Sequence, residues 1–144
     1  MEYGLYNWWP KTIRPNDAMD ERFDSMIHPE DIQLANEISP VGKVFVKTGR
    51  DGRYIVIEFG NNRLRVTPDN WEPVAGDGFK VGDKVRVLNN NGKNTPKEGY
   101  IVSMSWHNKN RSIIYHLSEN GKRLKKRYEA NDIERQFTSL ESTD

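Results

Sequence analysis

The chain contains no cysteine, which excludes disulfides, thiolate zinc sites and cysteine nucleophiles and suits a reducing compartment. No stretch approaches the ~20 apolar residues that a membrane-spanning helix needs. The N-terminus, MEYGLYNWWPKTIRP, lacks the continuous apolar run of a secretory signal. Hydrophobic residues are also scarce, at 35% of the 144 positions, against 30% charged residues. We therefore expect a cytoplasmic protein with a thin core and no membrane association.

Recognisable catalytic motifs are missing as well. There is no HExxH, no GxSxG and no GxxxxGK[ST]. No acidic residue accompanies the histidines as a third metal ligand; they are His28, His107 and His116. One acidic cluster departs from EF-hand spacing and fits a solvated surface better than a metal site; it comprises Asp17, Asp20, Glu21 and Asp24. The expectation is a non-enzymatic protein without metal or cofactor.

Aromatic residues, in contrast, are plentiful: 4 Trp, 6 Tyr and 5 Phe. A disordered chain carries few of them, so this chain should fold. Its length fits one domain or two very small ones.

Charge is segregated along the chain, although the net charge is only +1. The net charge is −5 over residues 1–37, +1 over 38–78, +9 over 79–128 and −4 over 129–144. A basic block therefore lies between two acidic ends, which points to an anionic partner or to compensation within the molecule.

The first 27 residues read as an irregular aromatic segment, because Pro10 and Pro15 oppose a regular helix or a central strand. Its aromatic residues are expected to plug one end of the β structure; a docking surface is the alternative. A short helix is predicted over 29–38. Pro29 suits its first position, and Pro40 ends it.

From residue 42 the apolar period becomes two, which predicts antiparallel β-strands joined by polar turns. Asn120–Gly121 predicts a hairpin turn, and GNN at 60–62 predicts another, across which Phe59 would face Leu64. The residues expected to be buried in the first half are Ile55, Ile57, Phe59, Leu64 and Val66. Those expected to be buried in the second half are Val85, Val87, Tyr100, Val102, Met104, Trp106, Ile113, Tyr115, Leu117 and Leu124.

The two β halves resemble each other in their order of strands and turns. Asp83–Leu88 reads as an extra strand without an equal in the first half. The expected organisation has an N-terminal segment with its helix at 1–41, packed on the β units. A first, incomplete unit follows at 42–75, then a second at 79–136 and a tail at 137–144.

The second half resembles SH3-like small barrels of the Tudor and KOW type. The motifs that carry this resemblance are VGDKVRV, GYIVSMSW, IYHLS, GKRLKKRY and NDIE. The stretches IEFGN and WEPV of the first half are similar to parts of the Tudor pattern. GLYNWWP together with HPED resembles an uncharacterised bacterial family that pairs such an N-terminus with a barrel-like end. The resemblance implies a mainly β fold of two SH3-like antiparallel units with one short N-terminal helix, and no activity.

The strongest functional signal is a basic strand in which Arg123, Lys125 and Arg127 alternate. All three would emerge on one face beside His116, with Lys122 and Lys126 at the rim. Like charges in a row repel, so an anionic partner would be stabilising. Two other interpretations remain open: charge that protects a sheet edge from aggregation, and an acidic N-terminal segment folded over the strand.

Tudor-like domains hold methylated side chains in aromatic cages, but alternating strand aromatics are more often core. The rings concerned are Trp71, Trp106, Tyr100, Tyr115 and Tyr128. The function predicted is a non-catalytic protein–protein interaction, of the inhibitor, immunity or adaptor type, with a partner that presents an acidic surface. The alternative is a nucleic-acid-binding small barrel that uses residues 79–128. The oligomeric state stays open.

Overall fold

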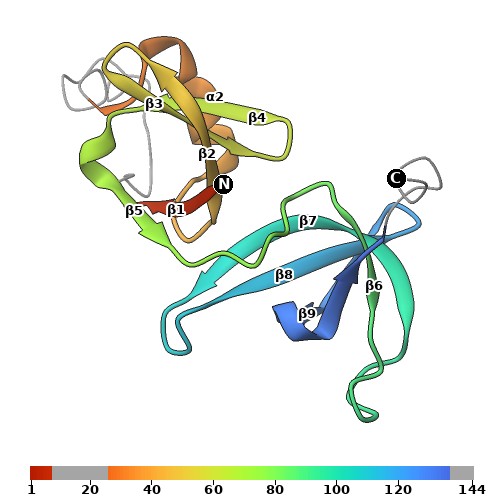
Figure 1. Cartoon of the computed structure of the whole chain (residues 1–144). Coiled ribbons are helices and arrows are strands. Elements are labelled where there is room, and N and C mark those ends of the chain that lie inside the picture. The colour runs from red at the N-terminus through yellow and green to blue at the C-terminus, as the bar shows by residue number, and fades with distance from the viewer. Residues whose placement is uncertain (8–25, 137–144) are drawn as a thin grey trace, which may run out of the picture. The chain divides into compact units, whose positions relative to one another are not determined.

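The computed structural model describes residues 1–7 and 26–136, and it is mainly β, as predicted (Figure 1). The chain divides into two compact units, Met1–Gly76 and Asp77–Asp144. Each unit contains one five-stranded antiparallel sheet. No helix within the described parts of the chain is long and apolar enough to cross a bilayer.

The first unit contains strands β1 (Glu2–Tyr6), β2 (Phe45–Asp51), β3 (Tyr54–Phe59), β4 (Asn62–Val66) and β5 (Trp71–Val74). Its sheet has the order β4-β3-β2-β1-β5. The 3-10 helix η3 (Pro68–Asn70) separates β4 from β5.

The second unit contains β6 (Lys84–Val87), β7 (Lys97–His107), β8 (Ser112–Glu119), β9 (Lys122–Tyr128) and β10 (Ile133–Arg135). Its sheet has the order β10-β6-β7-β8-β9. The 3-10 helix η4 (Ala130–Asp132) lies between β9 and β10. Strand for strand, this order is that of the first unit, with β6 in the place of β1 and β9 in the place of β4.

The strand β1 corrects two sequence-based expectations. Glu2–Tyr6 is the counterpart of β6, so the second half has no unmatched strand. The same residues form a regular strand between β2 and β5 instead of an irregular plug. Tyr3 and Tyr6 are buried there. The prolines misled the prediction because both follow the strand, and its partners lie some 40 and 70 residues further along the chain.

The short helix is confirmed. The 3-10 helix η2 (Pro29–Asp31) leads into α2 (Ile32–Ile38), and Ser39 ends it in the left-handed conformation at φ 51°. Pro29 supplies the fixed φ of the first helical position. His28 caps this start of the helix, because its Nδ1 accepts a hydrogen bond from the Glu30 backbone N–H at 3.1 Å.

Each unit buries its own apolar core. The predicted core of the first unit is confirmed, since all five residues are buried. In the second unit the prediction holds for Val85, Val87, Met104, Ile113, Tyr115 and Leu117. It is wrong for Tyr100 and Val102, which are 50% and 36% exposed, while Trp106 and Leu124 are only half-buried.

A β-bulge explains the exposed pair. Ile101 pairs with Leu117 and Ser103 pairs with His116, so Val102 is an extra residue on β7. The bulge shifts the alternation by one position. Ile101 therefore faces the core before it and Met104 after it, and Tyr100 is left on the outer face.

The predicted Asn120–Gly121 turn is confirmed, because Glu119 pairs with Lys122 across it. Both turn residues have positive φ, 51° and 79°, as a two-residue hairpin turn of this kind requires. The other hairpin differs from the prediction: Phe59 pairs with Asn62, and Ile57 rather than Phe59 opposes Leu64. Gly60 and Asn61 alone make that turn, which moves the register by two residues.

Candidate functional site: the cationic edge of the second unit

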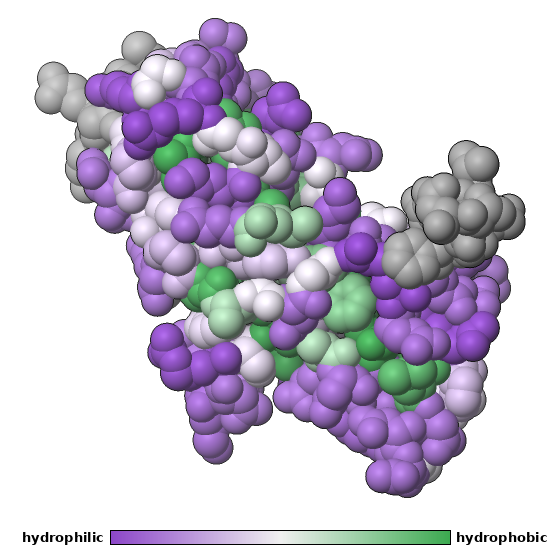
Figure 2. Space-filling view, viewed as in Figure 1, coloured by the Kyte–Doolittle hydropathy of each residue, from purple (hydrophilic) through white to green (hydrophobic). Residues whose placement is uncertain are grey.

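The predicted basic strand is β9, which lies at the end of the second sheet with β8 as its single neighbouring strand. All five of its lysine and arginine side chains are exposed; they are Lys122, Arg123, Lys125, Lys126 and Arg127. Over this unit, Figure 2 shows hydrophilic residues around a group of hydrophobic ones. The edge of the sheet therefore presents concentrated positive charge to solvent.

The register brings two of the three predicted cations together. Arg127 pairs with His116, and Arg123 pairs with Ser118, so these side chains share the outer face of the sheet. Between the two pairs, the three residues 124–126 oppose Leu117 alone. Lys125 lies within this irregularity and has no directly paired residue on β8.

The pKa of His116 is consistent with the proximity of Arg123 and Arg127. The pKa of His116 lies below its usual value, first because the ring is half-buried and then because Arg123 and Arg127 are close. Its Nε2 lies 3.5 Å from Ser105 Oγ on β7. A neutral imidazole therefore lies between the two guanidinium groups at neutral pH.

Tyr100 is a further residue of this face that sequence reasoning placed in the core. It pairs with Lys84 on β6 and with Ser118 on β8, which in turn pairs with Arg123. An exposed aromatic ring thus lies in a row of side chains that ends in a cation on each side. The exposed position follows from the bulge at Val102.

Charge compensation differs between the two ends of this outer face. Near β6, Glu98 lies 3.6 Å from Arg86 and 3.9 Å from Lys84. Near β9, Arg123, Lys125 and Arg127 make no ion pair with any described residue. A large part of the acidic N-terminal segment predicted to fold over this strand, residues 8–25, lies outside the described residues.

A cleft of about 240 Å³ borders β9 on the side of the loop before β7. Leu124 and Tyr128 supply its apolar lining, together with polar residues of the loop. Four lysines surround it: Lys93, Lys97, Lys125 and Lys126. Lys126 Nζ donates to the Lys93 carbonyl at 3.0 Å, which ties the strand to the loop. The cleft is therefore lined by two residues with apolar surface, four lysines and polar loop residues.

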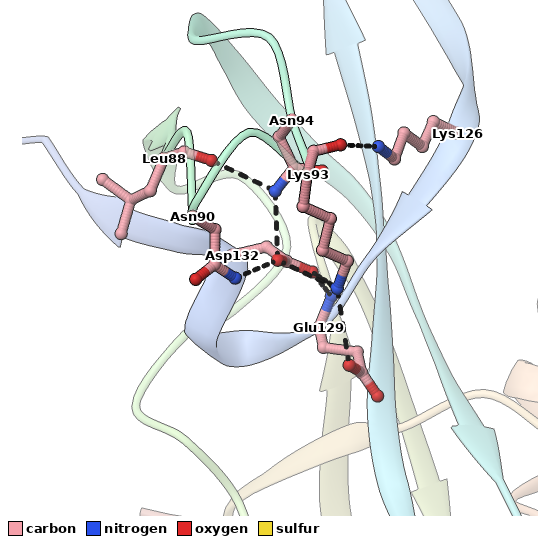
Figure 3. A network of polar contacts seen from close by, with 7 residues as sticks. All are labelled: Leu88, Asn90, Lys93, Asn94, Lys126, Glu129 and Asp132. Atoms are coloured by element: carbon pink, nitrogen blue, oxygen red, sulfur yellow. Dashed lines mark hydrogen bonds and ion pairs between the residues drawn. The ribbon is translucent and has the colours of Figure 1, made fainter.

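Asp132 holds that loop in place, as Figure 3 shows. Its carboxylate, 1% exposed, accepts hydrogen bonds from the side chains of Asn90, Asn94 and Lys93 and from the Glu129 backbone N–H, at 2.9–3.2 Å. Burial raises the pKa of Asp132, but these four donors outweigh burial and lower it to about 2. The acidic closing turn NDIE is thus a structural anchor for the lysine-lined cleft.

The other residues considered for functional sites are buried in the core or make contacts within the fold. Tyr115 and Tyr128 are 0% and 3% exposed, which excludes them from an open aromatic cage. Trp71 belongs to the first unit, where its ring lies over Gly4 and its Nε1–H donates to Glu2. His107 Nδ1 accepts the Asn110 backbone N–H in a turn. No group of three or more His, Asp or Glu among the described residues could hold a metal ion.

Comparisons with known proteins place the chain without assigning an activity. No curated protein and no solved structure matches it. A family model, described as a family of unknown function (DUF6960), matches residues 1–134. That match includes β1 through the closing turn at Asp132, that is, both sheets nearly in full. The chain therefore belongs to DUF6960, a family of unknown function.

Proposed function

We propose that this protein is a non-catalytic binding protein whose second unit, an SH3-like small barrel, docks an acidic partner protein through β9. The observation that carries the proposal is the set of exposed cations on β9 without a carboxylate partner among the described residues. The corresponding arginines of β4 are paired: Arg63 with Glu58 at 3.3 Å, and Arg65 with Asp31 at 2.9 Å.

Charge of this kind favours association with an anionic surface. Unscreened cations raise the rate of encounter with an oppositely charged partner and suppress pairing with cationic ones. The half-buried Leu124 and the cleft beside it add apolar contact area. A binding role without catalysis also accords with histidines that act in turns, at His28 and His107.

Single-stranded nucleic acid is the second candidate partner, and Tyr100 is the observation that favours it. An exposed ring between Lys84 and Arg123 could stack on a base while the cations contact phosphates. The two candidates share Arg123 and differ in the rest of the surface that they use. The protein partner requires the β9 edge and its cleft, whereas the nucleic acid requires the outer face of β7.

The test compares the full chain with two triple variants of equal charge. One neutralises the site (R123Q/K125Q/R127Q), and the other neutralises three exposed cations elsewhere (R50Q/K80Q/K109Q). Fluorescence anisotropy would measure binding of labelled poly-glutamate and of oligo-dT at 20 to 300 mM salt. We expect the site variant to bind poly-glutamate about tenfold or more weakly at low salt, and the control variant to bind almost as the parent does.

Equal binding of poly-glutamate by both variants would overturn the proposal of a β9 docking surface. Oligo-dT binding that a Tyr100→Ala substitution abolishes, in a chain that does not bind poly-glutamate, would establish the nucleic-acid alternative instead.

A further inference from the structure

The first unit contains its own example of a segment added to the fourth strand. Ile27 forms an antiparallel bridge with Val66 at the free edge of β4. The His28 N–H donates to the Arg65 carbonyl at 2.9 Å, and the Thr67 N–H donates to the Met26 carbonyl at 2.8 Å. The Ile27 side chain is fully buried. A short extended segment with one aliphatic anchor thus satisfies this edge.

A carboxylate follows the aliphatic anchor and fixes the segment to the strand. Asp31 accepts three hydrogen bonds from Arg65: from its backbone N–H at 2.8 Å and from its guanidinium group at 2.9 and 3.0 Å. Arg65 lies one residue before Val66. The recognition pattern on β4 is therefore an aliphatic side chain beside Val66 and a carboxylate on Arg65.

The same positions recur on β9. One residue separates Val66 from η3, as one residue separates Tyr128 from η4, and each ends the fourth strand of its unit. Arg127 accordingly corresponds to Arg65. Among the described residues, no strand or bridge pairs with the outer edge of β9, and no carboxylate contacts Arg127. The lysine-lined cleft lies at this edge, over Leu124 and Tyr128.

We propose that β9 binds an extended acidic peptide segment of a partner protein by strand addition, in the manner in which β4 binds Met26–Asp31. The partner's backbone pairs with the free edge of β9, an aliphatic side chain enters the cleft over Leu124 and Tyr128, and carboxylates face Arg127 and the cleft lysines. Backbone pairing supplies affinity and the cleft supplies selectivity. This inference rests on the proposed function and names the form of its partner.

The experiment uses an eight-residue peptide of alternating glutamate and valine, acetylated and amidated, with the full-length protein. Its first control is the same peptide N-methylated at alternate residues on one edge, prepared for both edges. Methylation removes donors and keeps the charge. Its second control groups the four valines at one end. Isothermal titration would give the affinities, and amide hydrogen exchange would report on Lys122–Tyr128.

Strand addition predicts that N-methylation of one edge weakens binding about tenfold or more, because several backbone hydrogen bonds are lost. N-methylation of the other edge should have little effect. Binding should slow amide exchange in β9, and L124D should weaken the alternating peptide more than the grouped one. If the spectrum of L124D shows unfolding, K125E, a substitution at an exposed position, takes its place with the same expected direction.

Equal affinities for the parent peptide and both N-methylated peptides would overturn strand addition, even with strong salt-dependent binding. That result would leave a charged docking surface without backbone pairing. Failure of poly-glutamate to distinguish the charge variants overturns the proposed function itself, so the two failures have different signatures.

Discussion

The two units have the same strand order, but they differ at the outer edge of the fourth strand. This edge is paired in the first unit and unpaired among the described residues of the second. In the first unit, the connection between the first two strands spans residues 7–44, and part of it, Met26–Asp31, pairs with β4. In the second unit the corresponding connection spans residues 88–96 and reaches β9 through Lys126 and the cleft lining alone. Within the described residues, the long connection thus pairs with the edge of β4, whereas the short one forms no strand or bridge with the edge of β9.

Both units also carry a bulge in their second strand. Thr48 is the extra residue of β2, as Val102 is of β7. A shared irregularity at the same place in two sheets indicates a requirement of the architecture, since a bulge increases the local twist by which a small sheet curls over its core. The difference between the units therefore lies in their connections and edge charges.

The largest effect expected on this comparison comes from the two carboxylates that anchor the connections. Asp132→Asn should lower the free energy of unfolding of the second unit by about 2–4 kcal/mol. The uncharged amide cannot accept all the hydrogen bonds that the buried carboxylate accepts from charged and neutral donors. Asp31→Asn should have a smaller effect, since Arg65 remains partly solvated. Urea unfolding followed by amide resonances of each unit measures both.

Acid should reproduce the Asp132 effect. The folded-state pKa of Asp132 is lowered from 3.8 to about 2, so its stabilisation is complete above pH ~4 and is lost as the pH falls toward 2. Glu134→Gln, at an exposed position, is the control. An Asp132→Asn variant with parental stability at pH 7 and a parental acid transition would show that the loop does not depend on this carboxylate.

A comparable but more local effect is expected from the cores. Leu117→Ala and its first-unit counterpart Ile57→Ala should each cost about 2–5 kcal/mol, because both side chains are fully buried. Val102→Ala should change stability by less than about 0.5 kcal/mol, because Val102 is the exposed extra residue of the bulge. Chemical denaturation measures all three. A large loss of stability from Val102→Ala would instead indicate that Val102 faces the core, as an uninterrupted alternation of β7 predicts.

The smallest effect concerns His116, which has no counterpart with two arginines in the first unit. Its lowered pKa means that the folded state prefers the neutral ring, so stability should decrease slightly as the pH falls below about 6.5. In an R123Q/R127Q variant the pKa should rise, although burial keeps it below the usual value. NMR titration of the imidazole protons measures this. An unchanged pKa would show that the two arginines do not lower the pKa of His116.

Local chemistry made much of the fold predictable from sequence. Asn120–Gly121 fixes its hairpin, and with it the common face of Arg123, Arg127 and His116, because few residue pairs adopt two consecutive positive φ angles. The helix at 29–38 was equally readable from its flanking prolines.

Non-local features could not be predicted. The pairing of β1 depends on strands far away in sequence, and the bulge at Val102 depends on the twist of an assembled sheet. The site inherited both kinds of error. The irregularity at 124–126 leaves Lys125 without a directly paired residue, and Tyr100 joined the outer face because of the bulge. The lysine cleft was hidden because its loop is anchored by Asp132, some 40 residues later.

The position of β1 has a consequence for biosynthesis. Glu2–Tyr6 is made well before one of its two neighbours, β5, which ends at Val74. At about 5–20 residues per second, roughly 4–14 s separate their synthesis. During that interval the aromatic strand has no β5 to pair with. The nascent first unit therefore exposes an unpaired edge of β1, which favours aggregation, until Trp71–Val74 emerges from the ribosome.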